Sequence, residues 1–210
     1  TKITDPTPSV SGAGGQAQID LIDDLVAELD GEWDAEMEGG SDVGAGAGPV
    51  GGSCSEAVWI DRIARLETLQ HRLASVQAAA IHAFARRHAA AQVTAYHADP
   101  QQAGSLDPRK LEHSIGDQIG LACHVSPGEG GKRMRMARDL RAGHQHVRAL
   151  FAAGRLSAHK TATITAATGD LDQTERAEVD RRLAGHDLSR LGVGRIRDLV
   201  TKIAAEVAPE

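Results

Sequence analysis

The stretch from Ser126 to Gly169 constrains the fold most strongly, because it holds the start and stop signals of three consecutive helices. Ser126 is a preferred N-cap, and Pro127 suits the first helical position. Glu129 stands where a capping-box carboxylate reaches back to the Ser126 amide. The first of the three helices is therefore predicted to start at 126–127, and an Arg-Ala-Gly sequence at 141–143 ends it.

A connection typical of a helix-turn-helix joins the other two helices of this stretch. The sequence predicts the second helix over 144–153. Gly154 provides the left-handed exit that ends it, and Leu156 is expected to fill the gap between the two helices. Ser157 is the N-cap of the third helix, which is predicted over 158–168.

The composition of the chain favours a fold built only of helices. Its 210 residues are 41% hydrophobic but only 2% aromatic, so the core must consist of Ala, Leu, Ile and Val. Such small side chains favour close helix packing, and the alternation typical of strands is almost absent. Further helices are predicted over 56–97, 107–125, 172–184 and 193–207. We therefore predict an all-α, multi-helix bundle with one long N-terminal helix and a helix-turn-helix-like centre.

The net charge of −6 hides an acidic tail attached to a basic body. Residues 1–56 hold twelve acidic residues and one basic residue, whereas residues 57–210 hold 22 basic and 17 acidic residues. Glycine runs also mark the first part, so we predict a flexible acidic tail over 1–55 and one all-α domain over 56–210. Within the tail, apolar residues at helical spacing predict a short amphipathic helix over 18–29. This helix either docks on a partner, folds back on the basic body, or stays a weakly helical patch.

The long helix predicted over 56–97 carries a heptad pattern of apolar residues. At 1.5 Å per residue it would span roughly 60 Å, which is long for a globular helix. It either pairs with a second copy in a homodimer or forms the spine on which the later helices lie. The expected seam consists of Ile63, Leu66, Leu69, Leu73, Val76, Ala80, Ala83 and Phe84.

Basic residues dominate the centre of the stretch that constrains the fold. Eight lysine or arginine residues and a single acid, Asp139, lie between Lys132 and Lys160 inclusive. A local field of this sign suits phosphate or another polyanion. The alternative is a solvated helix face on which arginine stems cover small core residues.

Catalytic, metal-binding and membrane motifs are absent from the sequence. None of the ten histidines has the spacing of a zinc site, and no Walker loop, dinucleotide fingerprint or elbow serine occurs. We therefore predict no catalytic residue, no metal, no cofactor and no small-molecule substrate. No apolar run approaches the length of a membrane span and no signal-peptide pattern opens the chain, so no membrane contact is expected. Two cysteines without a disulfide pattern are typical of a reduced, cytoplasmic setting.

Three segments resemble the DUF222 proteins, also called the 13E12 repeat family. They are IDRIARLETLQHRLASVQAA at 60–79, IGLACHVSPGEGGKRMRMARDL at 119–140 and ALFAAGRLSAHKTATITAATGDL at 149–171. The resemblance covers about residues 57–210. Members of that family commonly continue into a C-terminal HNH endonuclease domain and occur as mobile-element-like genes in actinobacteria. This chain contains no asparagine, which the standard HNH motif needs, so the resemblance implies cutting chemistry outside it.

The resemblance implies a nuclease context but supplies no catalytic residue, so whether the chain is an enzyme stays open. We predict a nucleic-acid-associated helical domain that positions DNA for a nuclease domain not present in this chain. Side chains of the basic helix would contact phosphates, which position DNA without reading its sequence. A helical dimerisation or protein-interaction module with no DNA contact is the alternative. The predicted DNA-contacting residues are Lys132, Arg133, Arg135 and Arg138 on the basic helix, and Arg155, Ser157, His159 and Lys160 at the start of the third helix.

Overall fold

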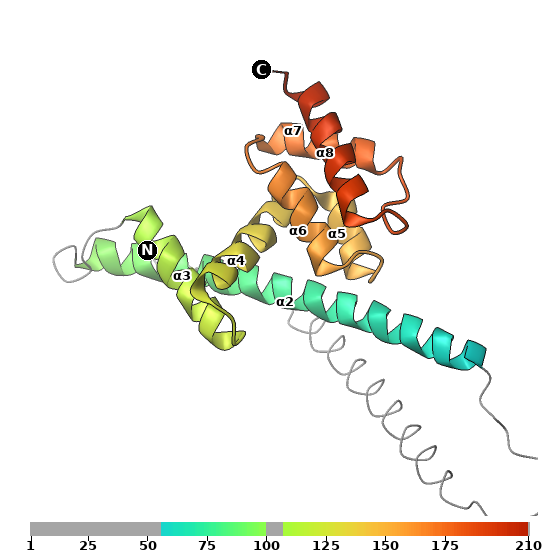
Figure 1. The fold of residues 1–210 in the computed structure, drawn as a ribbon. Helices are drawn as coiled ribbons and strands as arrows, with labels where there is room; N and C mark the ends of the chain where they lie inside the picture. Colours follow the sequence, from blue (N-terminus) through green and yellow to red (C-terminus); the bar gives the residue numbers. More distant parts are fainter. Residues whose placement is uncertain (1–55, 100–106, 210) are drawn as a thin grey trace, which may run out of the picture. The chain divides into compact units, whose positions relative to one another are not determined.

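The computed structural model describes residues 56–99 and 107–209, which form helices with short connections. Figure 1 shows these helices with the labels used below. They are α2 (Glu56–Ala98), α3 (Pro108–Ala122), α4 (Pro127–Arg141), α5 (Gln145–Ala152), α6 (Ala158–Ala167), α7 (Gln173–Leu183) and α8 (Val193–Val207). No strand occurs in this part of the chain, so the all-α prediction is confirmed. The predicted tail over 1–55 and its helix over 18–29 lie outside the described residues.

Side-chain caps set the start of four of the predicted helices, α3, α4, α6 and α7. The Ser126 hydroxyl accepts a hydrogen bond from the Glu129 amide at 3.3 Å, and an equivalent bond at Ser157 starts α6. Asp172 forms a capping box with Glu175, because each side chain accepts the backbone N–H of the other residue. These bonds satisfy helix amides that have no partner within the helix. The predicted starts of α4, α6 and α7 are therefore confirmed.

The hydrophobic core lies within the second unit of the chain, Ile60–Glu210. α4 buries Met134, Ala137 and Leu140 on its inward side. Leu156 is fully buried in the connection between α5 and α6, as expected. Removing such aliphatic side chains from water is the main stabilising contribution of a core of this kind. Other fully buried side chains are Phe151, Ile164, Leu183, Leu188, Ile196 and Val200.

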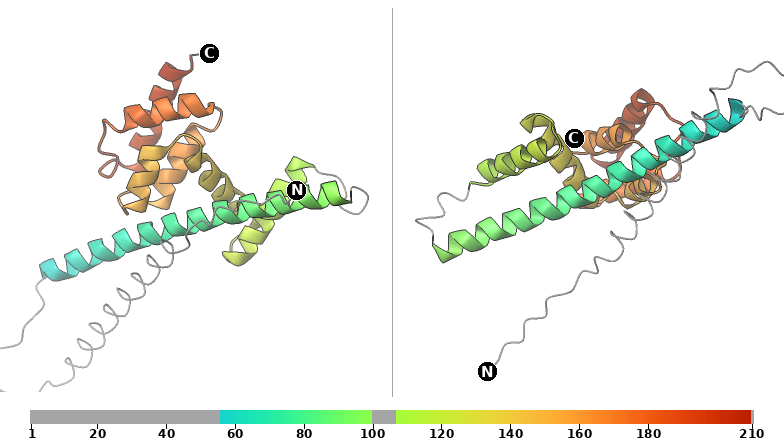
Figure 2. Two further views of the ribbon diagram at one scale, coloured as in Figure 1. Left: turned by 180° about the vertical axis from the view of Figure 1, so that it is seen from behind. Right: turned by 90° about the horizontal axis from the view of Figure 1, so that it is seen from below.

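Glycines bring α3 and α4 into close contact. Figure 2 shows the two helices as a hairpin joined by a tight turn. Gly116 and Gly120 of α3 lie against Gly130 of α4, and all three are buried. A Cβ atom on Gly130 would lie 2.5 Å from the Gly120 nitrogen and closer still to the Gly116 carbonyl oxygen. Only glycine therefore fits at this position, where one backbone approaches another.

α2 contacts the rest of the second unit through a face other than the predicted heptad seam. Ala78 and Ile81 are buried, whereas Ile63, Leu66 and Leu73 of the seam are exposed. The later helices therefore lie against a neighbouring face of α2 and not against the seam. Pairing of the seam with a second copy stays a prediction.

The turn between α5 and α6 is joined to α2 by backbone contacts. Gly154 adopts a φ of +76°, which is the left-handed conformation predicted for it. Its carbonyl oxygen lies within hydrogen-bond distance, 3.0 Å, of His71 Nδ1 on α2. A Cβ atom on Gly154 would lie 2.6 Å from the Thr68 carbonyl oxygen. Both the conformation and the close approach therefore select glycine at this turn.

A buried histidine joins the start of α5 to α6 and α7. His144 is almost fully buried, and its Nε2 atom lies 2.9 Å from the hydroxyl oxygen of Thr168. Its Nδ1 atom has no hydrogen-bond partner in the described part of the chain and lies 3.9 Å from the Asp180 carboxylate. Burial lowers the pKa of the His144 imidazole, and the Asp180 carboxylate only partly opposes this shift. His144 is therefore neutral in the folded protein near neutral pH.

The stability of the protein should fall as the pH drops below about 6.5, because His144 takes up a proton more readily in the unfolded chain. The pKa of His144 is lower in the folded protein than in the unfolded chain. The stability that neutral His144 contributes is therefore complete above the unfolded-state pKa. It is lost as the pH falls from that value towards the folded pKa. Urea unfolding at several pH values over this range measures how steeply the free energy of unfolding depends on pH. His144→Gln should flatten this slope. The exposed control His186→Gln should keep the slope, and an unchanged slope in His144→Gln would contradict the prediction.

Candidate nucleic-acid interface

Three of the predicted bases of α4 lie on its accessible side. Lys132 and Arg135 are exposed, and Arg135 forms no ion pair or side-chain hydrogen bond with any described residue. Arg133 is half-buried. The Glu129 carboxylate, which was expected to reach back to Ser126, instead lies 3.6 Å from both the Lys132 amine and the Arg133 Nε. Because exposed ion pairs contribute little, these bases remain available to an anion.

Arg138, the fourth predicted base of α4, turns towards α3. Its Nη1 lies 2.6 Å from the Glu112 carboxylate of α3, and its Nε lies 3.2 Å from the Asp139 carboxylate. Burial lowers the pKa of Arg138, but the hydrogen bonds to Asp139 and Glu112 outweigh burial and leave the pKa raised. A phosphate at this position would compete with two carboxylates, so Arg138 mainly joins α3 to α4.

The residues predicted at the start of α6 are partly occupied by contacts within the fold. The Ser157 hydroxyl caps the helix, and the Lys160 amine donates a hydrogen bond to the Ser189 carbonyl oxygen at 2.8 Å. Arg155 is exposed and lies 3.8 Å from a carboxylate of the loop after α7. His159 is exposed on the outer side of the helix. Of the four, His159 is therefore the most open to a ligand.

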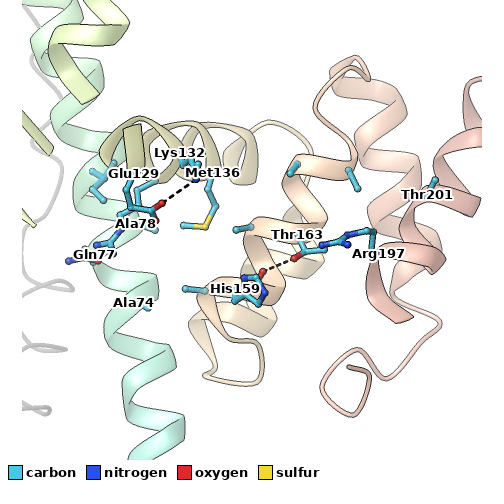
Figure 3. Close-up of a pocket in the computed structure, with 16 residues that line it drawn as sticks. Ala74, Gln77, Ala78, Glu129, Lys132, Met136, His159, Thr163, Arg197 and Thr201 are labelled. Atoms are coloured by element: carbon cyan, nitrogen blue, oxygen red, sulfur yellow. Dashed lines mark hydrogen bonds and ion pairs between the residues drawn. The ribbon is translucent and has the colours of Figure 1, made fainter. Parts of the chain in front are cut away.

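A cleft of about 830 Å³ lies between α2, α4, α6 and α8. Figure 3 shows Lys132 beside Glu129 on α4, and Arg197 of α8 beside Thr163 of α6. The predicted residues that line the cleft are Lys132, Arg133 and His159. Those that do not line it are Arg135, Arg138, Arg155, Ser157 and Lys160. Its apolar lining includes Ala74, Ala78, Ile81, Met136, Ala162 and Ala166.

Arg197 is the basic residue of the cleft that the sequence analysis missed. It is exposed on α8 and forms no ion pair or side-chain hydrogen bond with the described residues. Together with Lys132 and Arg133, it makes three bases against the single acid Glu129. The helix that carries Arg197 was predicted, but its packing against α6 is a tertiary contact that no local pattern shows.

The cleft combines basic and apolar side chains in its lining. Its lining contains no cysteine, serine or aspartate, and its one carboxylate lies between two bases. No group of three or more possible metal ligands occurs among residues 56–99 and 107–209. The same residues include no helix long and apolar enough to cross a membrane. The bases can attract an anionic group, and the alanine-rich lining can cover apolar atoms next to it.

Comparisons with known proteins found no match. No protein-family model matches the chain, and neither a curated protein nor a solved structure matches it. The likeness to the DUF222 proteins therefore stays an interpretation of the three sequence segments. The function proposed below rests on the geometry of α4 and of the cleft.

Proposed function

We propose that the helical domain binds DNA phosphates through α4 and the rim of the cleft, and that it positions DNA for a nuclease domain in a DUF222-type protein. The observation that carries this proposal is a cleft lined by Lys132, Arg133 and Arg197 and a single acid, Glu129, with Arg135 exposed on the same helix as Lys132. These bases come from two helices that are far apart in the sequence. The fold therefore concentrates positive charge in a chain whose net charge is −6.

The same side chains are better suited to contact phosphates than to recognise nucleobases. The cleft has no Phe, Tyr or Trp in its lining, and such side chains are what single-stranded bases stack on. α6 buries Thr161, Ile164 and Thr165, so little of it is free to enter a DNA groove. Phosphate contacts hold a duplex in place without reading it. We therefore expect binding to double-stranded DNA with little sequence preference.

Binding of the full chain to a labelled duplex of random sequence should weaken steeply with salt. Fluorescence anisotropy across a salt series measures how the logarithm of the binding constant falls with the logarithm of the salt concentration. The slope of this plot is about 0.9 for each phosphate neutralised. A variant that loses three basic side chains, through Lys132→Gln, Arg135→Gln and Arg197→Gln together, should show a slope lower by about 3. It should also bind at least about tenfold more weakly at low salt. Circular dichroism checks that the variant keeps its helices.

The matched control removes three exposed bases that lie outside the cleft and α4. Arg65→Gln, Arg109→Gln and Lys110→Gln change the net charge by the same amount. This control should bind DNA nearly as well as the unchanged chain. An equal loss in both variants would show a general charge effect, and no binding at low salt would overturn the proposal.

A protein-interaction module without DNA contact is the second candidate function, and one observation favours it. The heptad seam of α2 exposes large apolar side chains, including Ile63, Leu66 and Leu73. A module of this kind would show no salt-dependent binding to the duplex, so the same titration separates the two candidates.

A further inference from the structure

α2 presents an apolar strip that no helix among the described residues covers. Ile63, Leu66, Leu73 and Phe84 expose 60%, 43%, 44% and 37% of their surface. Contiguous apolar surface of this kind marks an interaction site, whereas single exposed apolar residues do not. The strip, called the α2 strip below, consists of Ile63, Leu66, Leu69, Leu73, Val76, Ala80, Ala83 and Phe84.

The heptad spacing of the α2 strip shows what shape of partner it fits. Leu66, Leu73 and Ala80 repeat every seven residues, and Leu69 and Val76 lie between them at the second core position. A strip with this repeat packs against another long helix, because successive side chains enter the spaces between those of the facing helix. The partner is therefore a helix of similar length with an apolar strip of its own.

The sizes of the side chains along the strip match an antiparallel second copy. Leu66, Leu69 and Leu73 lie in its first half, whereas Ala80 and Ala83 lie in its second half, before the terminal Phe84. In an antiparallel pair Leu66 faces Ala83, Leu69 faces Ala80, and Leu73 faces Val76. Each of these three layers then combines a large side chain with a smaller one, as close packing requires. At the two ends of the strip, Ile63 would face Arg86 and Phe84 would face Arg65.

A parallel pair would pack the same strip poorly. Ala80 would face Ala80 of the second copy, and Leu66 would face Leu66. The end of the interface with facing alanines would then be left with a gap, which destabilises a packed contact. The size pattern therefore favours the antiparallel arrangement over the parallel one.

We propose that the protein forms a homodimer in which the α2 strips of two copies pack antiparallel. The apolar surface still exposed along the two strips is on the order of 1,000 Å² in total, which lies at the lower end of specific interfaces. The dimer is therefore reversible and depends on concentration. This proposal does not rest on DNA binding, because no contact in the strip involves the bases of the cleft.

The arrangement leaves the cleft accessible in both copies. At 100° per residue, Ala74 and Ala78, which line the cleft, lie roughly 80° and 120° around α2 from Leu66, whereas Gln77 lines the cleft next to the strip. In an antiparallel pair the two-fold axis is perpendicular to both helices, so the two cleft-bearing faces lie on the same side of the helix pair. Each dimer would thus carry two clefts, so an anionic polymer would find two binding sites instead of one.

Sedimentation velocity of the full chain over a concentration series tests the dimer. The unchanged chain should shift from monomer to dimer as the concentration rises, and Leu66→Glu with Leu73→Glu should stay monomeric while keeping its helical circular dichroism. The matched control is Leu121→Glu, because Leu121 on α3 exposes 79% of its surface but lies outside the strip. It should dimerise like the unchanged chain. A monomer at every concentration, or a dimer that survives the double substitution, would overturn the proposal.

A distance between two spin labels tests the direction of pairing. Ala90→Cys, in a background with Cys54→Ser and Cys123→Ser, places one label per copy on the exposed end of α2. At 1.5 Å per residue, an antiparallel pair centred between residues 74 and 75 separates the two positions by about 45 Å. A parallel pair would bring them to within about 20 Å, because packed helices lie 8–10 Å apart. The short distance would overturn the antiparallel arrangement.

Discussion

Replacing Gly130 with alanine should lower the free energy of unfolding by about 3 kcal/mol, although alanine is the better helix former. The new methyl group would stand less than 3 Å from three backbone atoms of α3, namely the Gly116 carbonyl oxygen and the nitrogen and Cα of Gly120. Backbone atoms cannot rotate aside as a long side chain can. The two helices therefore have to separate, and α3 loses part of its contact with α4. Urea unfolding followed by circular dichroism measures the loss.

Gly128 is the matched control for this substitution, because it lies in the same helix two residues earlier. A Cβ atom there has nothing within 4 Å. Gly128→Ala should therefore leave the free energy of unfolding unchanged or raise it by up to about 1 kcal/mol. Gly130→Ala should therefore lower the free energy of unfolding, whereas Gly128→Ala should raise it or leave it unchanged. Equal stabilities would contradict the close packing of α3 on α4.

Helix limits could be predicted from the sequence because their signals act within one turn. α8 spans Val193–Val207 as predicted, and the capping box at Asp172 starts α7. The helix predicted over 107–125 ends earlier, at Ala122. His124 is the cause, since it adopts a φ of 53° in the turn that follows, and no glycine marks that turn in the sequence.

The face that α2 turns to the body could not be predicted from the sequence. The heptad pattern drew attention to large residues such as Leu66, but the body covers a neighbouring face with Ala78 and Ile81. Small residues permit close approach of another element, and alanine is common on every side of this helix. The choice of face depends on where Gly154 meets Thr68, which are far apart in the chain.

The sequence predicted the positive charge of the candidate site but not which of its side chains lie close to one another. The basic stretch was evident, yet the partner of Arg138 lies 26 residues away on α3. The Lys160 amine likewise binds a carbonyl oxygen 29 residues further on. Arg197 joins the cleft from α8, outside the basic stretch altogether. Such contacts follow from the packing of helices, so a single sequence shows the charges without showing which of them meet.

Replacing Asp180 with alanine should lower the free energy of unfolding by about 3 kcal/mol, because this side chain of α7 caps the start of α5. Its Oδ2 accepts the His146 amide at 2.6 Å, and its Oδ1 accepts the Val147 amide at 3.0 Å. The residue at the N-cap position of α5, His144, makes no capping bond with its own side chain. Asp180 is buried, so its removal leaves two helix amides without a partner away from water.

Thermal unfolding measures this loss, which corresponds to a fall in Tm of about 10 °C for a protein of this size. Asp180→Asn keeps an acceptor oxygen for one of the two amides and should fall between the alanine variant and the unchanged chain. The control Asp198→Ala removes an exposed carboxylate from α8 and should leave the Tm nearly unchanged. A similar Tm for Asp180→Ala and the control would mean that α5 does not depend on a cap from α7, and the role assigned to Asp180 would then be wrong.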